Sequence, residues 1–344
     1  MGQFLSQPLT DKTVQYEELD KFSYCLGSMQ GYRLTQEDAH SITHYPNVNF
    51  IDVHNNQSQM DMKIYGVFDG HGGSQSSNYL SEHLPNSIYE EFNNNNNSKI
   101  RQIMTNQGLI ISKFKDSFLK TDYNLYKHYQ HRHHHSNSGS TAILGIILNN
   151  NELYTLNTGD SRLITSINGV PKNLSFDHKP NHIGELIRIN DAGGSVSYNR
   201  VGGVLALSRA FGDFNFKLRN FRSFNDGNNK LVSEETQVTV EPEIIHHKIS
   251  INDEFIIIAC DGIWDVFTNQ DLIKYIRNKL VLGAKLDEIV ANLLDHTLTL
   301  ANQTTGVGFD NMSIIIIACQ YDQESLEQWY QRMKLKIEIE KQII

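Results

Sequence analysis

Residues 63–73 read KIYGVFDGHGG, an apolar run that stops at Asp69 and passes into three glycines and a histidine. The run Ile64–Phe68 has the length and composition of a strand covered on both faces, because such strands exclude charge almost completely. Four further runs with these properties predict buried strands: Thr141–Leu148, Leu153–Asn157, Glu254–Cys260 and Met312–Cys319.

Segments with the periodicity of amphipathic helices lie between these runs. The helices expected from this pattern are 74–91, 98–129, 270–282 and 286–300. Strands in several clusters, with helix pairs between the clusters, indicate an α+β fold built in layers. We find no repeat with a period of about 20–50 residues.

The composition is that of a soluble globular chain. Its 344 residues carry a formal net charge of −9 and show no basic patch, so a nucleic-acid partner is not expected. No apolar stretch reaches the roughly 20 residues that span a bilayer. The cysteines Cys25, Cys260 and Cys319 form no CxxC pair, which predicts reduced, buried thiols rather than disulfides or a zinc site.

Three parts of the chain differ in composition. Residues 1–21 read as a polar leader, 22–320 as one catalytic domain and 321–344 as a helical tail. The asparagine run 93–97 and the histidine-rich tract 128–135 read as loops. We expect the tail to pack on the core, and a helix that faces a partner or a membrane is the alternative.

The first residues match M-G-x-x-x-[ST], with Gly2 and Ser6 in place, which predicts N-myristoylation of Gly2. The first basic residue is Lys12, so a single acyl chain would act without a polybasic partner and would hold a membrane only marginally. We expect a cytoplasmic protein with weak, reversible membrane contact at most. An unmodified start is the alternative.

An aspartate stands at one end of four strand-like runs: Asp69, Asp160, Asp261 and Asp310. Each one alone is typical of a turn. If the strand ends meet, the four carboxylates converge, and like charges at close range need compensation. Carboxylate-rich sites with oxygen ligands alone suit Mg²⁺ or Mn²⁺, and these ligands accept both ions equally. Zinc is disfavoured because the sequence has no Cys/His spacing typical of a zinc site.

Two further side chains fit phosphate chemistry. Arg33, close to Glu37 and Asp38, can hold phosphate oxygens through two parallel hydrogen bonds, and a surface ion pair is the alternative. His71 follows Asp69 by two residues and can protonate a leaving alkoxide, and a metal ligand or loop hydrogen bond is the alternative.

Nine blocks of the chain, in order, resemble the metal-dependent protein phosphatases of type 2C (the PPM family). The blocks are 27–40, VFDGHGG at 67–73, SGSTA at 138–142, NTGDSR at 157–162, DHKP at 177–180, 200–213, Glu241-Pro242-Glu243, ACDGIWDV at 259–266 and DNMS at 310–313. The resemblance covers roughly residues 22–320. It implies a four-layer α-β-β-α sandwich, with two central antiparallel β-sheets flanked by helix pairs.

The resemblance also implies which residues hold metal. Asp69 would bridge two Mg²⁺ or Mn²⁺ ions, and Gly70 would offer a backbone carbonyl to one of them. Asp261 and Asp310 would complete the ligands of the other. Asp160, with Asp261, would serve a weaker third ion.

Other roles follow from the same resemblance. Glu37 and Asp38 would act through metal-bound water, Arg33 would bind the substrate phosphate and His71 would be the general acid. The segment 180–200 would form a flap beside the site. The chain is thus expected to hydrolyse phosphoserine and phosphothreonine in proteins, as a monomer.

Three alternatives share the fold: an inactive scaffold, a hydrolase of another phosphoester such as a nucleotide, and a regulatory module. The scaffold and the regulatory module are disfavoured because every ligand and acid position is filled, and the other hydrolase because no basic or aromatic features that would bind a base are evident. One departure from the family pattern is Phe309, where many members have a small or polar residue, and we expect it to alter packing near Asp310.

Overall fold

The structure is a computed structural model that describes residues 4–54, 56–93, 106–131, 137–217, 236–321 and 323–343. It confirms an α+β fold with antiparallel sheets. The chain divides into two compact units, which are described separately below. Unit 1 consists of residues 1–38, 162–175 and 247–344, and unit 2 consists of residues 39–161 and 176–246.

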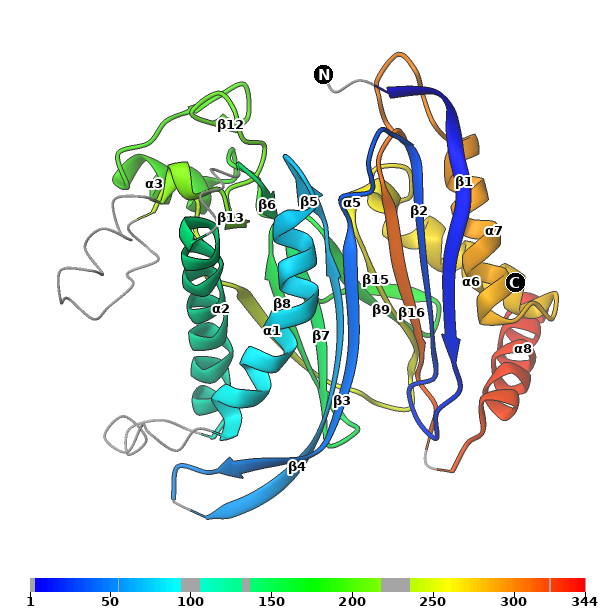
Figure 1. Ribbon diagram of the computed structural model, residues 1–344. Coiled ribbons are helices and arrows are strands. Elements are labelled where there is room, and N and C mark those ends of the chain that lie inside the picture. The colour runs from blue at the N-terminus through cyan, green and yellow to red at the C-terminus, as the bar shows by residue number, and fades with distance from the viewer. Residues whose placement is uncertain are drawn as a thin grey trace. The chain divides into compact units, whose positions relative to one another are not determined.

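Unit 1 is built on a six-stranded antiparallel sheet with the strand order β1-β2-β16-β15-β9-β10. The strands are β1 (Phe4–Glu17), β2 (Tyr24–Arg33), β9 (Arg162–Ile167), β10 (Val170–Asn173), β15 (Asp253–Ala259) and β16 (Met312–Ala318). The helices are α5 (Asp261–Trp264), α6 (Asn269–Val281), α7 (Leu286–Thr299) and α8 (Leu326–Ile343). Helix α7 packs on β1, β2 and β16, as Figure 1 shows.

The core of unit 1 lies between this sheet and its helices. Alternate isoleucines of β16, Ile314 and Ile316, face the helices and are fully buried. Gly27 on β2 lets α7 approach closely, because a Cβ there would overlap the side chain of Val290. Trp329 of α8 is also fully buried in this core, which confirms that the C-terminal tail packs as a helix.

Residues 4–17 of the segment predicted as a polar leader instead form strand β1, so this part of the prediction was wrong. Residues 14–17 of β1 pair with residues 24–27 of β2 in antiparallel register. The strand lies at the edge of the sheet and exposes most of its side chains, so its sequence is polar. A pattern search that requires apolar runs misses a strand of this kind.

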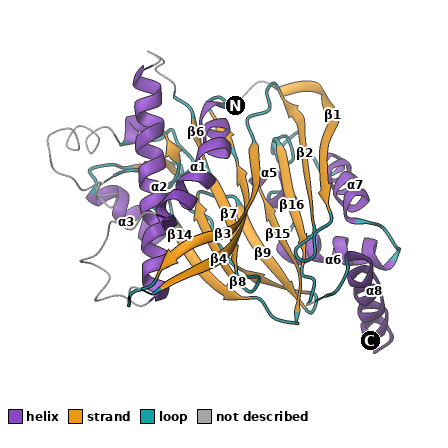
Figure 2. Ribbon diagram, turned by 60° about the horizontal axis from the view of Figure 1, so that its bottom comes forward, coloured by secondary structure: helices purple, strands orange, loops and turns teal. Residues whose placement is uncertain are grey.

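Unit 2 has a five-stranded antiparallel sheet with the order β14-β8-β7-β4-β3. Its strands are β3 (Ala39–Ile51), β4 (Gln57–Phe68), β7 (Ala142–Leu148), β8 (Glu152–Thr158) and β14 (Glu243–Lys248). Helices α1 (Gln75–Asn93) and α2 (Asn106–His131) lie side by side against it (Figure 2). The side chains of Leu80, Phe114 and Phe118 are fully buried in the core of this unit.

Smaller elements complete unit 2. A three-stranded sheet has the order β13-β6-β5, formed by β5 (Gly70–His71), β6 (Gly139–Ser140) and β13 (Phe211–Gly212). Helix α3 (Ile183–Asp191) precedes a short hairpin of β11 (Val196–Ser197) and β12 (Arg200–Val201). A 3₁₀ turn, η2 (Phe214–Phe216), follows β13.

The predicted buried strands and helices are present with shifted ends. The strand over residues 64–68 begins earlier, at Gln57, because β4 continues in its hairpin with β3, where only residues 57–59 are exposed. The first part of the helix expected over 98–129 lies outside the described residues, as do the asparagines at 94–97 and residues 132–135 of the histidine-rich tract. The loop predictions were wrong for Asn93, which ends α1, and for residues 128–131, which form the last turn of α2. The three cysteines are free and buried, as predicted. No described helix is long and apolar enough to span a membrane.

Candidate active site

In unit 1 the ends of two neighbouring strands carry Asp261 and Asp310. Strand β15 runs antiparallel to β16, and Ala259 pairs with Ile314, so the end of β15 lies beside the start of β16. Asp261 follows as the first residue of α5. Gly262 makes this approach possible, because a Cβ there would overlap the carbonyl oxygen of Asn311. The predicted meeting of strand ends therefore holds for this pair of aspartates.

Strand β2 brings Arg33 to the same edge. Met29 of β2 pairs with Met312 of β16, and the guanidinium Nη2 of Arg33 lies 2.5 Å from Oδ2 of Asp310. About two fifths of the Arg33 side chain is exposed to solvent. A cation that is half-exposed and paired with a carboxylate can change partners when an anionic ligand arrives.

Asn311 holds the loop that carries Arg33, Glu37 and Asp38. Its Oδ1 accepts a hydrogen bond from the backbone N–H of Glu37 at 2.9 Å. Its Nδ2 donates to the carbonyl oxygens of Gln30 at 2.9 Å and Thr35 at 3.0 Å. Sequence reasoning did not assign Asn311 a role, although it stands inside the block DNMS and next to a predicted ligand.

Asp38 is the most informative carboxylate of unit 1. It is buried, and among the described residues its Oδ2 has no hydrogen-bond partner. Burial and the negative charge of Asp310 raise the pKa of Asp38 to about 7, although hydrogen bonds from Ser313 and Cys260 oppose this shift. A hard divalent cation would relieve both the charge and the unpaired oxygen, so these donors fit Mg²⁺ or Mn²⁺.

In unit 2, Thr141 links the strand ends that carry Asp69 and Asp160. The backbone N–H of Thr141 donates to the carbonyl oxygen of Asp69 at 2.9 Å, and the N–H of Asp69 donates back to Oγ1 of Thr141 at 3.2 Å. The same Oγ1 lies 2.8 Å from Oγ of Ser161. The two aspartates therefore stand at one edge of the sheet of unit 2.

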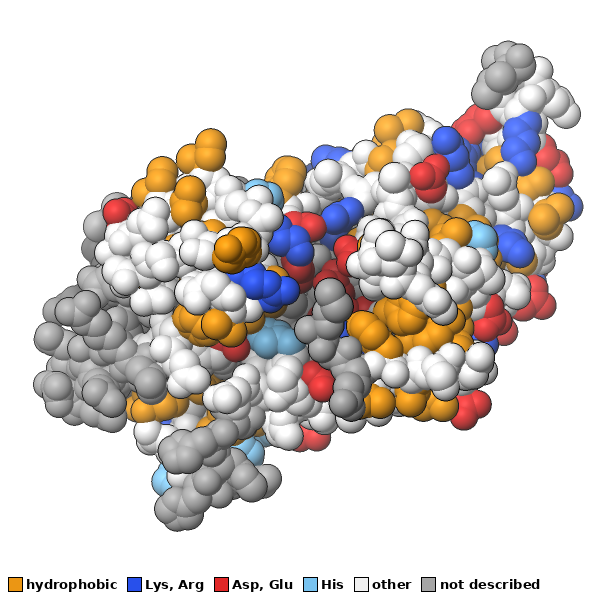
Figure 3. All heavy atoms as spheres, turned by 90° about the horizontal axis from the view of Figure 1, so that it is seen from above, with side chains coloured by type: hydrophobic (Ala, Val, Ile, Leu, Met, Phe, Trp, Pro, Cys, Tyr) orange, Lys and Arg blue, Asp and Glu red, His pale blue; other side chains and the backbone are white. Residues whose placement is uncertain are grey.

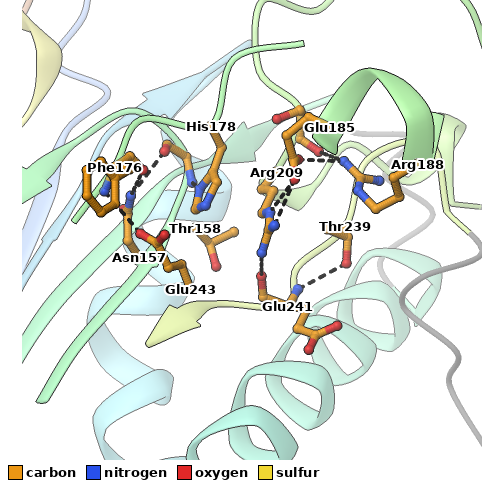
Figure 4. Close-up of polar contacts among 12 residues, drawn as sticks. Asn157, Thr158, Phe176, His178, Glu185, Arg188, Arg209, Thr239, Glu241 and Glu243 are labelled. Carbon is orange, nitrogen blue, oxygen red and sulfur yellow. Dashed lines mark hydrogen bonds and ion pairs between the residues drawn. The ribbon is translucent and has the colours of Figure 1, made fainter. Parts of the chain in front are cut away.

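Asp160 already has a cationic partner. Its buried carboxylate forms an ion pair with Nζ of Lys179, from the block DHKP. The neighbouring His178 accepts a hydrogen bond at Nδ1 from the N–H of Gly159 at 3.2 Å (Figure 4). Burial, together with the positive charge of Arg209, lowers the pKa of His178 to about 3. His178 is thus a neutral acceptor that shapes the loop before Asp160.

The predicted flap, residues 180–200, consists of α3 and the first residues of the β11–β12 hairpin. Glu185 of α3 binds two arginines, with Arg188 Nη2 at 2.8 Å and Arg209 Nη2 at 2.7 Å, as Figure 4 shows. Burial alone would raise the pKa of Glu185, but the two arginines together lower it to about 2. The ion pairs of Glu185 thus connect α3 of the flap to Arg209, which lies just before β13.

The outer side of the flap is apolar. Figure 3 shows hydrophobic side chains gathered over this part of unit 2. Exposed ones on α3, the β11–β12 hairpin and the turn after it are Ile183, Ile187, Tyr198 and Val204.

His71 lies on β5, and its Nε2 is 2.7 Å from Oδ2 of Asp213, which follows β13. Gly70, the predicted carbonyl ligand, precedes it on the same short strand. Asp213 was not singled out from the sequence, and the only signal was its place at the end of the block 200–213. The histidine therefore has a carboxylate partner from a distant part of the chain.

Each unit thus assembles part of the predicted site. Unit 1 brings together Arg33, Asp38, Asp261 and Asp310, with Glu37 on the same loop, and unit 2 brings together Asp69, Gly70, His71 and Asp160. That all of these side chains serve one centre stays a prediction. Phe309 packs against Tyr32 with 4.2 Å between ring centroids, so the aromatic departure supports the strand that carries Arg33.

Similarities to known proteins cover nearly the whole chain. A model of the protein phosphatase 2C family matches residues 22–306. The chain is 43% identical to protein phosphatase 2C homolog 4 of Saccharomyces cerevisiae over 398 aligned residues, which take in all of both proteins. It is 36% identical over 330 residues to protein phosphatase 2C homolog 2 of Schizosaccharomyces pombe, covering 96% of this chain and 81% of that protein.

A solved structure has the same fold. The crystal structure of a phosphatase from Toxoplasma gondii matches 92% of this chain and 97% of its own with a TM-score of 0.68. The two sequences are 23% identical, so this likeness supports the fold alone.

Proposed function

Because this chain belongs to the protein phosphatase 2C family, whose members are protein serine/threonine phosphatases, we propose that it hydrolyses phosphoserine and phosphothreonine in proteins at a binuclear Mg²⁺ or Mn²⁺ centre. The family is metal-dependent. The proposed centre takes Asp69 and the Gly70 carbonyl from unit 2, and Asp261 and Asp310 from unit 1. Glu37 and Asp38 would bind through water, and Asp160 with Asp261 would serve a weaker third ion.

The observation that carries this proposal is the unpaired oxygen of buried Asp38, close enough to Asp310 for the two charges to interact. When bound, a pair of divalent cations would lower the pKa of a water ligand and neutralise charge on the phosphate. The chain itself supplies the oxygen donors, at strand ends that the two sheets hold in place.

Arg33 is the proposed phosphate-binding residue. Its guanidinium now pairs with Asp310. Once Asp310 serves as a metal ligand, Arg33 can exchange this partner for two equatorial oxygens of the substrate phosphate, which it matches in geometry. The positive charge then balances the charge that the phosphoryl group carries in the transition state.

His71 is the proposed general acid. The alkoxide of a seryl or threonyl side chain is a poor leaving group, so it needs a proton as the bond to phosphorus breaks. An imidazole beside the reacting phosphate can supply this proton, which is typically worth about 10²–10⁴ in rate. Its place two residues after Asp69 puts it next to the proposed metal ligands.

We also propose a cytoplasmic location and N-myristoylation of Gly2, on the grounds of the sequence start alone. Residues 1–3 lie outside the described residues. Intact-mass analysis of the protein purified from its native cells tests this. A mass increase of one myristoyl group on the N-terminal peptide supports the proposal, and an unmodified peptide contradicts it.

The proposed activity is tested by phosphate release from a phosphothreonine peptide, with Mn²⁺ or Mg²⁺ and with excess EDTA. We expect release that depends on metal and that Asp69→Asn abolishes. Asp116→Asn, on α2 of the same unit, is the matched control and should keep wild-type activity. Folded wild-type protein that releases no phosphate with either metal would favour an inactive scaffold.

A further inference from the structure

The three-stranded sheet of unit 2 places a carboxylate on the proposed general acid. His71 on β5 pairs with Gly139 on β6, and Gly139 pairs with Gly212 on β13. Asp213 comes directly after this row, and its Oδ2 lies 2.7 Å from Nε2 of His71. The Asp213 side chain is 7% exposed and the His71 side chain 29%, so the carboxylate lies behind the ring rather than in front of it.

Gly139 leaves room for this pair. A Cβ built on Gly139 would overlap both Nε2 of His71 and Oδ2 of Asp213. Any side chain at this position would therefore push the imidazole and the carboxylate apart. Gly139 lies on β6, the central strand of this sheet, between β5 with His71 and β13, which Asp213 follows. The missing side chain of Gly139 therefore provides the space in which His71 and Asp213 meet.

A buried ion pair fixes the backbone that carries Asp213. Asp122 of α2 and Lys217 lie 2.9 Å apart, and each side chain is only 2% exposed. Oδ1 of Asp122 accepts a hydrogen bond from the N–H of Gly212 at 2.8 Å, and Lys217 donates to the carbonyl of Ala210 at 2.6 Å. Gly212 before Asp213 and Lys217 after it thus both bind the carboxylate of Asp122.

Asp213 itself adopts a conformation that needs such support. Its φ of 47° is in the left-handed region, which costs a residue with a side chain free energy. The hydrogen bonds on either side determine this conformation, and it turns the carboxylate towards His71. The position of the His71 imidazole therefore depends on Asp213, whose backbone is in turn held by the buried ion pair between Asp122 of α2 and Lys217.

We propose that Asp213 is a positioning residue for His71, an inference that rests on the proposed function. Its carboxylate accepts the Nε2–H, which fixes the ring orientation and leaves Nδ1 as the nitrogen that transfers the proton. As the bond from phosphorus to the seryl or threonyl oxygen breaks, the proton on Nδ1 passes to that oxygen. The imidazole is then neutral and keeps its Nε2–H on Asp213.

The test compares two leaving groups. A phosphothreonine peptide releases an alkoxide that needs a proton, whereas p-nitrophenyl phosphate releases a stable phenolate that does not. We expect Asp213→Asn to lower kcat for the peptide by about 10–100-fold with KM unchanged, as for residues that orient a catalytic group. For p-nitrophenyl phosphate we expect a change of less than about threefold.

A double-mutant cycle with His71→Ala makes the test sharper. If Asp213 acts through His71, Asp213→Asn causes no further loss of peptide hydrolysis in the His71→Ala protein. Gly139→Ala is a second variant that keeps both side chains but separates them, and it should show the same dependence on the leaving group. Asp116→Asn is the control, and circular dichroism checks that each variant folds.

The outcomes separate the two proposals. An equal loss for both substrates, additive losses in the cycle, or no loss for Asp213→Asn would each overturn the role of Asp213 while leaving the phosphatase activity in place. Wild-type protein that hydrolyses neither substrate would overturn the proposed function, and this inference with it.

Discussion

The two units hold their parts of the proposed site in different ways. In unit 1 the charged side chains stand at the ends of long strands, and the residues behind them are fully buried isoleucines such as Ile257 and Ile314. In unit 2 the histidine lies on a strand of two residues, with polar support behind it from Asp122 and Lys217. Apolar packing places the unit 1 group, whereas a buried ion pair supports the place of His71 in unit 2.

This difference has a consequence for mutations. Arg33, Asp261 and Asp310 of the unit 1 group are partly exposed, so their loss should affect activity and leave stability almost unchanged. The polar network of unit 2 is itself part of the core, so its loss should affect both.

Asp310→Asn should lower kcat by at least about 10³-fold, because the change removes a charge that the proposed centre requires. The free energy of unfolding should stay within about 0.5 kcal/mol of wild type, since the side chain is partly exposed. Steady-state kinetics and urea unfolding measure the two effects. Asp295→Asn, on α7 in the same unit, is the control. A large loss of stability would show that unit 1 also relies on its charges.

Asp122→Asn should destabilise the protein by about 3–5 kcal/mol, because it leaves Lys217 charged and unpaired in the core of unit 2. Urea unfolding at pH 7 measures this. Replacing both residues by apolar ones, Asp122→Leu with Lys217→Met, should cost less stability and still impair peptide hydrolysis through Asp213. If Asp122→Asn is harmless, buried ion pairs do not hold this unit.

Glu185→Gln tests the flap of the same unit through its pH dependence. The pKa of Glu185 is lowered to about 2 in the folded protein, against burial, by Arg209 and Arg188. The ionised carboxylate therefore stabilises the fold above about pH 4.5, by roughly 3 kcal/mol, and this is lost as pH falls towards 2. The Glu185→Gln protein should have a lower free energy of unfolding than wild type at pH 7. Between pH 5 and pH 3 its free energy of unfolding should fall by less than that of wild type.

Urea unfolding of wild type and Glu185→Gln at pH 7, 5 and 3 measures this pH dependence, with Glu90→Gln as the control. Glu90 is a surface residue of α1 in the same unit, and it should behave as wild type. An equal pH dependence of Glu185→Gln and wild type would mean that the arginine cluster does not stabilise the flap.

Phe4→Leu should have the smallest effect. The guanidinium carbon of Arg33 lies 5.7 Å from the centroid of the Phe4 ring, and an exposed cation–π contact is worth about 0.5–1 kcal/mol. We expect KM for the phosphothreonine peptide to rise by about two- to fivefold, with kcat unchanged. A change in kcat instead would place β1 in the chemistry rather than in phosphate binding.

The sequence was sufficient to predict the elements that apolar packing determines. The strands β7 and β16 and residues 255–259 of β15 contain no charged residue because both faces are covered, and an aspartate close to the end of such a run lies at a sheet edge. The half-exposed strands β1 and β3 could not be found in this way. Their alternation with polar residues resembles a loop when no neighbour is known.

The polar support could not be predicted at all. Asp122 and Lys217 are 95 residues apart, and His71 and Asp213 are 142 apart. Nothing local marks such partners, because a lysine or an aspartate within a helix or turn is usually exposed. Their pairing depends on how α2, β6 and β13 come together, which is a property of the fold and not of any segment.

We propose that residues of both units bind the same metal ions. Isothermal titration calorimetry of Mn²⁺ into wild-type protein, Asp69→Asn and Asp310→Asn tests it without recourse to activity. We predict that wild-type protein binds two Mn²⁺ ions with high affinity. In either variant the binding of both Mn²⁺ ions should be lost or markedly weakened, since each substitution removes a ligand to a shared centre. If each variant loses one ion and binds the other with unchanged affinity, the units bind metal separately and the proposed centre is wrong.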